Sequence, residues 1–183
     1  MTTYETLLPL AEEIHRGNHK WWHDLGTGVC ILETRNRMEL LMLVVTEVSE
    51  YVDADATGSL DDHLPAYKGS HVELADIAIR LLDMIGAENK IAGDVCTMRV
   101  ATLCNGVQAP LNLISVLSLA AESWRKGRVA IYRSLLNTAL YVTCDIASRQ
   151  CDLPKMIKVK RAYNAVRADH TIEARRAAGG KRI

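Results

Sequence analysis

The sequence lacks a long apolar segment and any regular cysteine pattern. Its longest strongly apolar run, residues 40–45, is far shorter than the roughly 20 residues that a membrane-spanning helix needs. The five cysteines are odd in number and form no C-x-x-C pair, which argues against a disulfide framework and a zinc site. No charged segment followed by an apolar one begins the chain, so no secretory signal is expected. These absences predict a cytoplasmic protein with no membrane partner.

Proline and strand-like alternation are also scarce. Only four prolines occur in 183 residues, of which 49% are hydrophobic, and apolar residues recur with helical spacing along most of the chain. We therefore expect one all-α domain over residues 1–183. Helices are expected at residues 3–16, 33–54, 71–85, 89–104, 111–126, 129–149 and 154–168. Gly86 is expected to end the third helix, and residues 175–183 to form a mobile tail.

Two acidic pairs lie within apolar stretches. They are Glu47-x-x-Glu50 and Glu73-x-x-Asp76, separated by 22 residues. Residues i and i+3 share one face of a helix, so two antiparallel helices would bring four carboxylates together. Such a cluster requires a cation, and oxygen ligands without His or Cys suit Mg²⁺, with Mn²⁺ as a substitute. The alternative is two amphipathic helices with solvated acidic edges.

The net charge of zero conceals an uneven distribution. Residues 1–154 contain 13 basic and 20 acidic residues, a net of −7, whereas residues 155–183 contain 9 and 2, a net of +7. A basic tail is compatible with nucleic-acid binding. The i, i+4, i+7 spacing of Lys160, Asn164 and Arg167 instead favours a helix face that reads phosphate and a sugar or base edge. A solvated basic helix end is the alternative; nucleic acid is not the expected partner.

The sequence also contains a weak internal similarity. A shift of 62 residues aligns the segment that begins at residue 135 with the one that begins at residue 73. In this alignment, Leu119, Leu135 and Thr138 replace three of the acidic residues. One interpretation is a duplicated pseudo-dimer, with a metal-binding unit at residues 33–105 and a ligand-less unit at 111–168. Chance alignment of two helical hairpins is the other.

These motifs together resemble those of a known family. The E-x-x-E, E-x-x-D and K-x-x-x-N-x-x-R patterns resemble the all-α nucleoside triphosphate pyrophosphohydrolase superfamily (MazG-like). Residues 20–86 and 155–183 are similar to its phage-type members in particular. The resemblance implies a MazG-like helical bundle and Mg²⁺-dependent hydrolysis between the α- and β-phosphates of a nucleotide. It also implies a homodimer, or a monomer if a fused repeat replaces one subunit.

The resemblance assigns roles to individual residues. The implied metal ligands are Glu47, Glu50, Glu73 and Asp76; the implied catalytic base is Glu47 or Glu50; and the implied nucleotide contacts are Lys160, Asn164 and Arg167. Two further expectations come from the residues themselves. Trp21 and Trp22 can stack on a base, although one ring of such a pair usually packs in the core. Arg80 and Asp83 can support the metal ligands, or pair with each other within their helix.

Two functions are compatible with the sequence. The first is a nucleotide pyrophosphohydrolase whose substrate is a nucleoside triphosphate, with a deoxynucleotide favoured. The second is a non-catalytic helical module that senses a nucleotide or acts as an adaptor through its basic tail. The presence of all four acidic residues favours the enzyme.

Overall fold

The computed structural model describes residues 3–98 and 109–177, and it is a bundle of helices. Apart from two isolated bridges, His23 with Cys30 and Leu60 with Lys68, the regular structure in these ranges is helical. The elements are α1 (Thr3–Leu7), η1 (Leu8–Leu10), α2 (Ala11–Gly17), η2 (His19–Trp22), α3 (Arg37–Thr57), α4 (Gly69–Ala92), α5 (Ala109–Arg125), α6 (Val129–Ala147), α7 (Leu153–Val166), η4 (Ala168–His170) and α8 (Ile172–Arg176). The all-α prediction is confirmed. Among the described residues, no helix has the length and apolar character needed to cross a bilayer.

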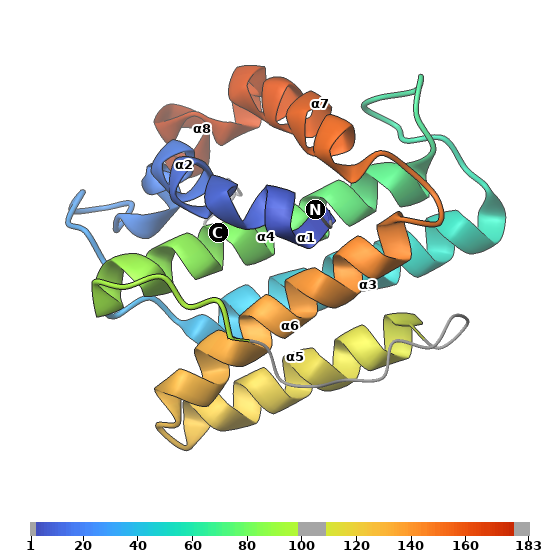
Figure 1. The fold of residues 1–183 in the computed structure, drawn as a ribbon. Helices are drawn as coiled ribbons and strands as arrows, with labels where there is room; N and C mark the ends of the chain where they lie inside the picture. Colours follow the sequence, from blue (N-terminus) through green and yellow to red (C-terminus); the bar gives the residue numbers. More distant parts are fainter. Residues whose placement is uncertain (1–2, 99–108, 178–183) are drawn as a thin grey trace.

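Helix α4 is the centre of the bundle. It contacts α2, α3, α6 and α7, and most of its residues are buried; the partly exposed Glu73, Asp76, Arg80 and Asp83 share one face. In Figure 1, α2 and α7 lie on one side of α4, whereas α6 and α5 lie on the other. A side chain of α4 can therefore meet groups from several distant parts of the sequence.

Local sequence signals fix the ends of the long helices. The Asn36 side chain accepts hydrogen bonds from the amides of Met38 and Glu39 at the start of α3, and Gly58 ends this helix with a φ of 67°. At the start of α7, the Asp152 side chain accepts from the amide of Lys155. α3 and α7, which carry candidate site residues, therefore have defined starting points.

Several predicted boundaries are wrong. Gly86 lies inside α4, where an added Cβ would be 2.4 Å from the Ala11 carbonyl oxygen; it permits the close approach of α2 instead of ending a helix. Gly93, with a φ of 71°, is the actual end. Residues 89–92 belong to α4, 93–98 are not helical, and the rest of the helix expected at 89–104 lies outside the described residues. The tail is helical up to Arg176.

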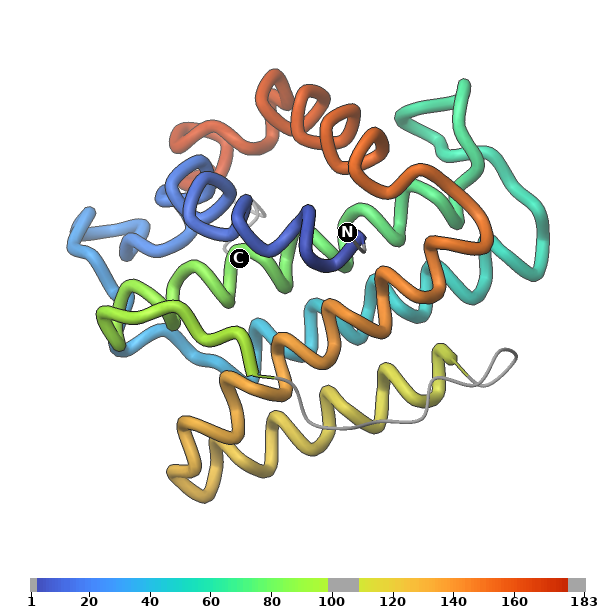
Figure 2. Tube along the Cα trace, viewed as in Figure 1, coloured from blue at the N-terminus to red at the C-terminus, as the bar shows by residue number. Residues whose placement is uncertain are grey.

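Two antiparallel helix pairs, α3–α4 and α5–α6, pack against each other through α3–α5 and α4–α6 contacts. In Figure 2, α3 and α5 run in opposite directions, and so do α4 and α6. A two-fold axis perpendicular to the bundle would relate the pairs in this way. The hairpin expected over residues 111–149 is therefore present and packs on the acidic helices, while the duplication itself stays a prediction.

Candidate metal and nucleotide site

Three carboxylates from two adjacent helices converge. Glu47 comes from α3, Glu73 and Asp76 come from α4, and one oxygen of each lies within 4.8 Å of the others. The i, i+3 spacing places the two α4 carboxylates on one helix face. Within residues 3–98 and 109–177, no other three His, Cys, Asp or Glu side chains come this close. We call these three residues the carboxylate group.

Glu73 is strongly affected by its surroundings. Its Oε2 atom is buried and has no hydrogen-bond partner. Burial, together with the Asp76 and Glu47 carboxylates, raises the pKa of Glu73 to about 9. A buried acidic oxygen without a partner is costly in a purely structural role. It fits a metal ligand, because a cation would both pair with the oxygen and offset the repulsion. The carboxylate group can therefore hold a metal ion.

Two basic side chains contact the carboxylate group. Arg80, one turn after Asp76, donates to Glu47 Oε1 from Nε at 2.7 Å and lies 2.6 Å from it through Nη2. Lys160 of α7 is 5% exposed, and its Nζ lies 2.7 Å from Asp76 Oδ2. Burial raises the pKa of Asp76 to about 6, although Lys160 opposes the rise. The basic helix α7 therefore reaches the carboxylates of α4.

Glu50 lies beside the carboxylate group without belonging to it. Its side chain is exposed, and partial desolvation and the neighbouring Glu47 carboxylate raise its pKa. Glu50 lies about one turn after Glu47 on α3, and its exposed side chain places it at the rim of the site. The structure thus brings together three of the four predicted metal ligands and leaves the fourth next to them.

A cavity of about 620 Å³ adjoins the carboxylate group, since Asp76 and Arg80 line it. Its apolar wall includes Ile14, Leu40, Leu43, Ile79 and Met84. Its basic lining includes Lys20, Arg35, Lys158 and Arg161. Cavities of roughly 300–1,000 Å³ with apolar walls and a few polar groups are typical of small-molecule sites. This lining suits an anionic ligand that has an apolar or aromatic part.

Comparisons with known proteins do not assign this site. No protein-family model, curated protein or solved structure matches the chain. The function must therefore be inferred from the geometry and from the motifs.

Asp83 organises the N-terminal segment of the chain. Its Oδ1 accepts a hydrogen bond from Trp22 Nε1 at 2.9 Å and lies 2.8 Å from His15 Nδ1, and its Oδ2 accepts from Asn18 at 3.0 Å. Burial raises the pKa of Asp83, and the contact with His15 opposes this rise. Arg80 pairs with α3 instead of with Asp83. Both residues were expected to support the metal ligands. Arg80 contacts the ligand Glu47, whereas Asp83 contacts the N-terminal segment that forms part of the cavity wall.

The two tryptophans have different environments. Trp22 is 3% exposed and packs edge-on against His15, so its ring is fixed in the core below the cavity. Trp21 forms a less buried part of the cavity wall, and the Arg175 guanidinium lies 4.0 Å from its ring centroid. Because it is less buried, Trp21 is better placed than Trp22 to stack on a base, through the ring face that Arg175 does not cover.

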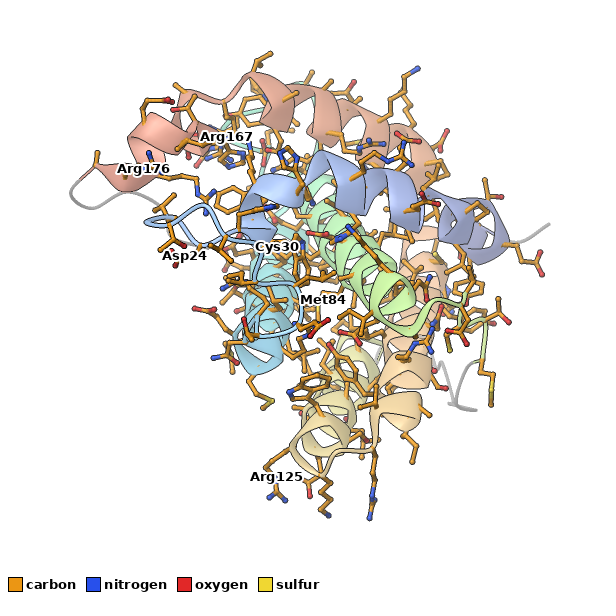
Figure 3. The ribbon with its side chains drawn as sticks, turned by 90° about the vertical axis from the view of Figure 1, so that its left-hand side faces the viewer. Asp24, Cys30, Met84, Arg125, Arg167 and Arg176 are labelled. Atoms are coloured by element: carbon orange, nitrogen blue, oxygen red, sulfur yellow. The ribbon has the colours of Figure 1, made fainter. Side chains whose placement is uncertain are left out.

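The stripe expected on α7 is only partly maintained. Asn164 lines the cavity, and its Oδ1 is buried without a hydrogen-bond partner. Arg167 follows the last residue of the helix, where the backbone turns to an extended conformation, and its guanidinium bonds to Asp169 at 2.9 and 2.7 Å. Figure 3 shows Arg167 and Arg176 on the side of the molecule that carries Asp24. Lys160 and Asn164 thus face the site. Arg167 lies at the edge of the site, where it is paired with Asp169.

Two features of the site were not predicted from the sequence: the basic lining and the return of the C-terminal segment. Lys158, Arg161 and Asn164 are spaced i, i+3, i+6, a helical stripe that could have been detected. The Arg175 side chain is 3% exposed and donates to the Lys20 carbonyl at 2.8 Å. This contact had no detectable signal, because a pair of arginines near a chain end usually indicates a solvated segment.

Proposed function

We propose that the protein is a metal-dependent nucleoside triphosphate pyrophosphohydrolase, which cleaves between the α- and β-phosphates and releases a monophosphate and pyrophosphate. The observation that carries the proposal is a carboxylate group able to hold a cation, directly beside a basic cavity. The MazG-like motifs lie on the residues that line this region, which supports the same reaction. A deoxynucleoside triphosphate is the proposed substrate.

The donor atoms favour Mg²⁺ or Mn²⁺. All three converging ligands are carboxylate oxygens, which hard cations prefer. Glu47, Glu73 and Asp76 would hold the ion, and Glu50 would join them from the rim by a change of rotamer. When bound, the ion supplies positive charge to the phosphates and lowers the pKa of the attacking water.

The remaining residues would bind and orient the nucleotide. Lys158 would offer positive charge to the phosphates, as would Arg161, which is paired with Glu13 at 2.7 Å in the free protein, and Trp21 with the apolar wall would receive the base. The unpaired Oδ1 of Asn164 can accept a hydrogen bond from the sugar or base. Glu50 is the proposed proton acceptor, because its pKa is raised and Glu47 would be committed to the metal.

Product analysis tests the proposal. The protein is incubated with a panel of deoxynucleoside and nucleoside triphosphates plus Mg²⁺, and the products are separated. We expect monophosphate and pyrophosphate, with Asp76→Asn slower by at least about 100-fold. Asp145→Asn, which removes an acid paired with Arg149 on α6, is the matched control and should match the parent. Nucleotide binding without turnover would reject the enzyme in favour of the nucleotide-sensing module.

A further inference from the structure

The guanidinium of Arg80 shares an oxygen with the proposed metal ligand Glu47. Two of its nitrogen atoms, Nε and Nη2, contact Glu47 Oε1, while the other carboxylates of the group lie within 4.8 Å. A divalent cation bound to the carboxylate group would therefore stand close to a fixed positive charge. Since like charges repel and the oxygen has few lone pairs, Arg80 and the metal compete for Glu47.

We propose that Arg80 changes partners during binding: the metal displaces it from Glu47, and the freed guanidinium binds a phosphate of the nucleotide. This inference rests on the proposed function. It makes Arg80 a phosphate-binding residue and not a support for the metal ligand. The motifs that suggested the reaction do not include this residue.

Exposure distinguishes Arg80 from the second basic residue in the site. The Lys160 side chain is 7% exposed and is held between α7 and α4, so it has little room to move. The Arg80 side chain is 38% exposed and lines the cavity beside Asp76. A partly solvated guanidinium on a long side chain can turn from one anion to another with little loss of packing. Arg80 is therefore the exchangeable cation, and Lys160 is the fixed one.

The position of Arg80 suits a phosphate partner. It is four residues after Asp76, so it lies on the same face of α4, about 6 Å farther along the axis. A phosphate that contacts a metal at the carboxylate group would lie within reach of its side chain. The planar guanidinium offers five N–H donors and can bind two phosphate oxygens at once.

The exchange predicts opposite effects of one substitution on two ligands. Removing the charge of Arg80 removes a competitor of the metal, so metal affinity should rise. The same substitution removes a phosphate partner, so nucleotide affinity should fall. A residue that merely oriented Glu47 would give a loss of metal affinity, because substitution of such supporting residues usually weakens binding.

Metal binding is measured first, without nucleotide. Mn²⁺ is titrated into metal-free protein, and the free ion is followed by electron paramagnetic resonance. We expect Arg80→Gln to bind Mn²⁺ roughly three- to tenfold more tightly than the parent. Arg80→Lys keeps the charge and should resemble the parent. Arg149→Gln, which breaks a partly exposed ion pair with Asp145 at the end of α6, is the matched control and should leave Mn²⁺ affinity unchanged.

Nucleotide binding is measured next, in saturating Mn²⁺, with an α,β-methylene deoxynucleoside triphosphate that cannot be cleaved. We expect both Arg80→Gln and Arg80→Lys to bind it at least about tenfold more weakly than the parent, because neither retains the two-pronged donor. Circular dichroism of each variant checks the helical fold.

Two results would overturn the inference. Weaker or unchanged Mn²⁺ binding by Arg80→Gln would show that Arg80 does not compete with the metal. Unchanged binding of the analogue, or none by the parent, would remove the phosphate role. Failure of the proposed function would be observed separately, as an absence of pyrophosphate release by the parent. The Mn²⁺ titration does not depend on turnover, because it measures metal binding at Glu47 directly.

Discussion

At the scale of single residues, Glu73 is the group whose chemistry depends most on its neighbours. Burial and two nearby carboxylates all favour its protonated form. Glutamine has nearly the same shape as that form and carries no charge. We therefore predict that Glu73→Gln raises the melting temperature of the metal-free protein at neutral pH, because glutamine has no proton that must be taken up on folding, while Mg²⁺ affinity falls at least about tenfold.

Thermal unfolding with and without Mg²⁺ tests this prediction. The parent should gain stability when the metal is added, since a ligand of the folded state stabilises it by mass action. Glu73→Gln should gain much less. If its melting temperature rose with Mg²⁺ as much as that of the parent, Glu73 would not be a ligand.

The pKa shift also predicts a pH dependence. The folded-state pKa of Glu73 lies near 9, above its ordinary value of 4.5, so the folded chain holds a proton that the unfolded chain has released. The stability from this group is fully present below about pH 4.5 and declines as the pH rises toward 9. Relative to Glu73→Gln, the metal-free parent should lose stability over this window, with a slope of at most about 1.4 kcal/mol per pH unit.

Urea unfolding of the parent and of Glu73→Gln at several pH values measures that slope. The variant serves as the control, because every other titrating group is common to both proteins. A constant difference in unfolding free energy between pH 5 and 9 would contradict the raised pKa. Mg²⁺ affinity of the parent should rise over the same interval, since the metal requires the ionised carboxylate.

The sequence predicted much of the site at this scale, but not its contacts. The spacing of Glu47, Glu73 and Asp76 within apolar stretches was sufficient to bring them together. The pairing of Arg80 with Glu47, and not with Asp83, could not be predicted, because both acids are within reach of its side chain. The choice depends on α2, whose His15 and Asn18 satisfy Asp83. That information lies more than sixty residues away in the sequence.

At the scale of secondary-structure elements, Gly86 shows why helix ends were harder to predict than helices. A glycine after an apolar stretch is a common termination signal. In this chain the same residue lies inside α4 and is in contact with α2, where a Cβ would be 2.7 Å from the His15 Cβ. To interpret Gly86 correctly, one must know that α2 packs against it, and a single sequence does not reveal which helix packs on which.

Gly86→Ala gives a prediction whose sign distinguishes the two interpretations. Helix propensity alone would make alanine more stable by about 1 kcal/mol. The clash with the Ala11 carbonyl, 2.4 Å from the added Cβ, should instead destabilise the protein by about 1–3 kcal/mol, measured by urea unfolding. Gly17→Ala is the control: nothing lies within 4 Å of its Cβ position, and a neutral or slightly stabilising effect is expected.

At the scale of the whole molecule, one chain supplies both signs of charge to the site. The carboxylate group comes from α3 and α4, and Lys160 comes from α7, more than eighty residues later in the same chain. The second helix pair, α5–α6, packs on the first and has no comparable acidic group among the described residues. Minimal members of the family that the motifs resemble generally assemble from several chains. Here a single chain contains the carboxylates and their basic partner.

This arrangement predicts that activity does not depend on sharing between chains, whether the protein is a monomer or a homodimer. Asp76→Asn and Lys160→Met should each reduce pyrophosphate release by at least about 100-fold, because each removes a charge from the same site.

Unfolding and refolding a mixture of the two variants, which allows mixed dimers to form, should not restore activity. The refolded parent is the control for recovery. Restoration toward about one quarter of the parent's activity would mean that Asp76 of one chain works with Lys160 of another, since half of the dimers would be mixed and each would have one intact site of two. Activity per chain that stays constant on dilution would agree with the self-contained site.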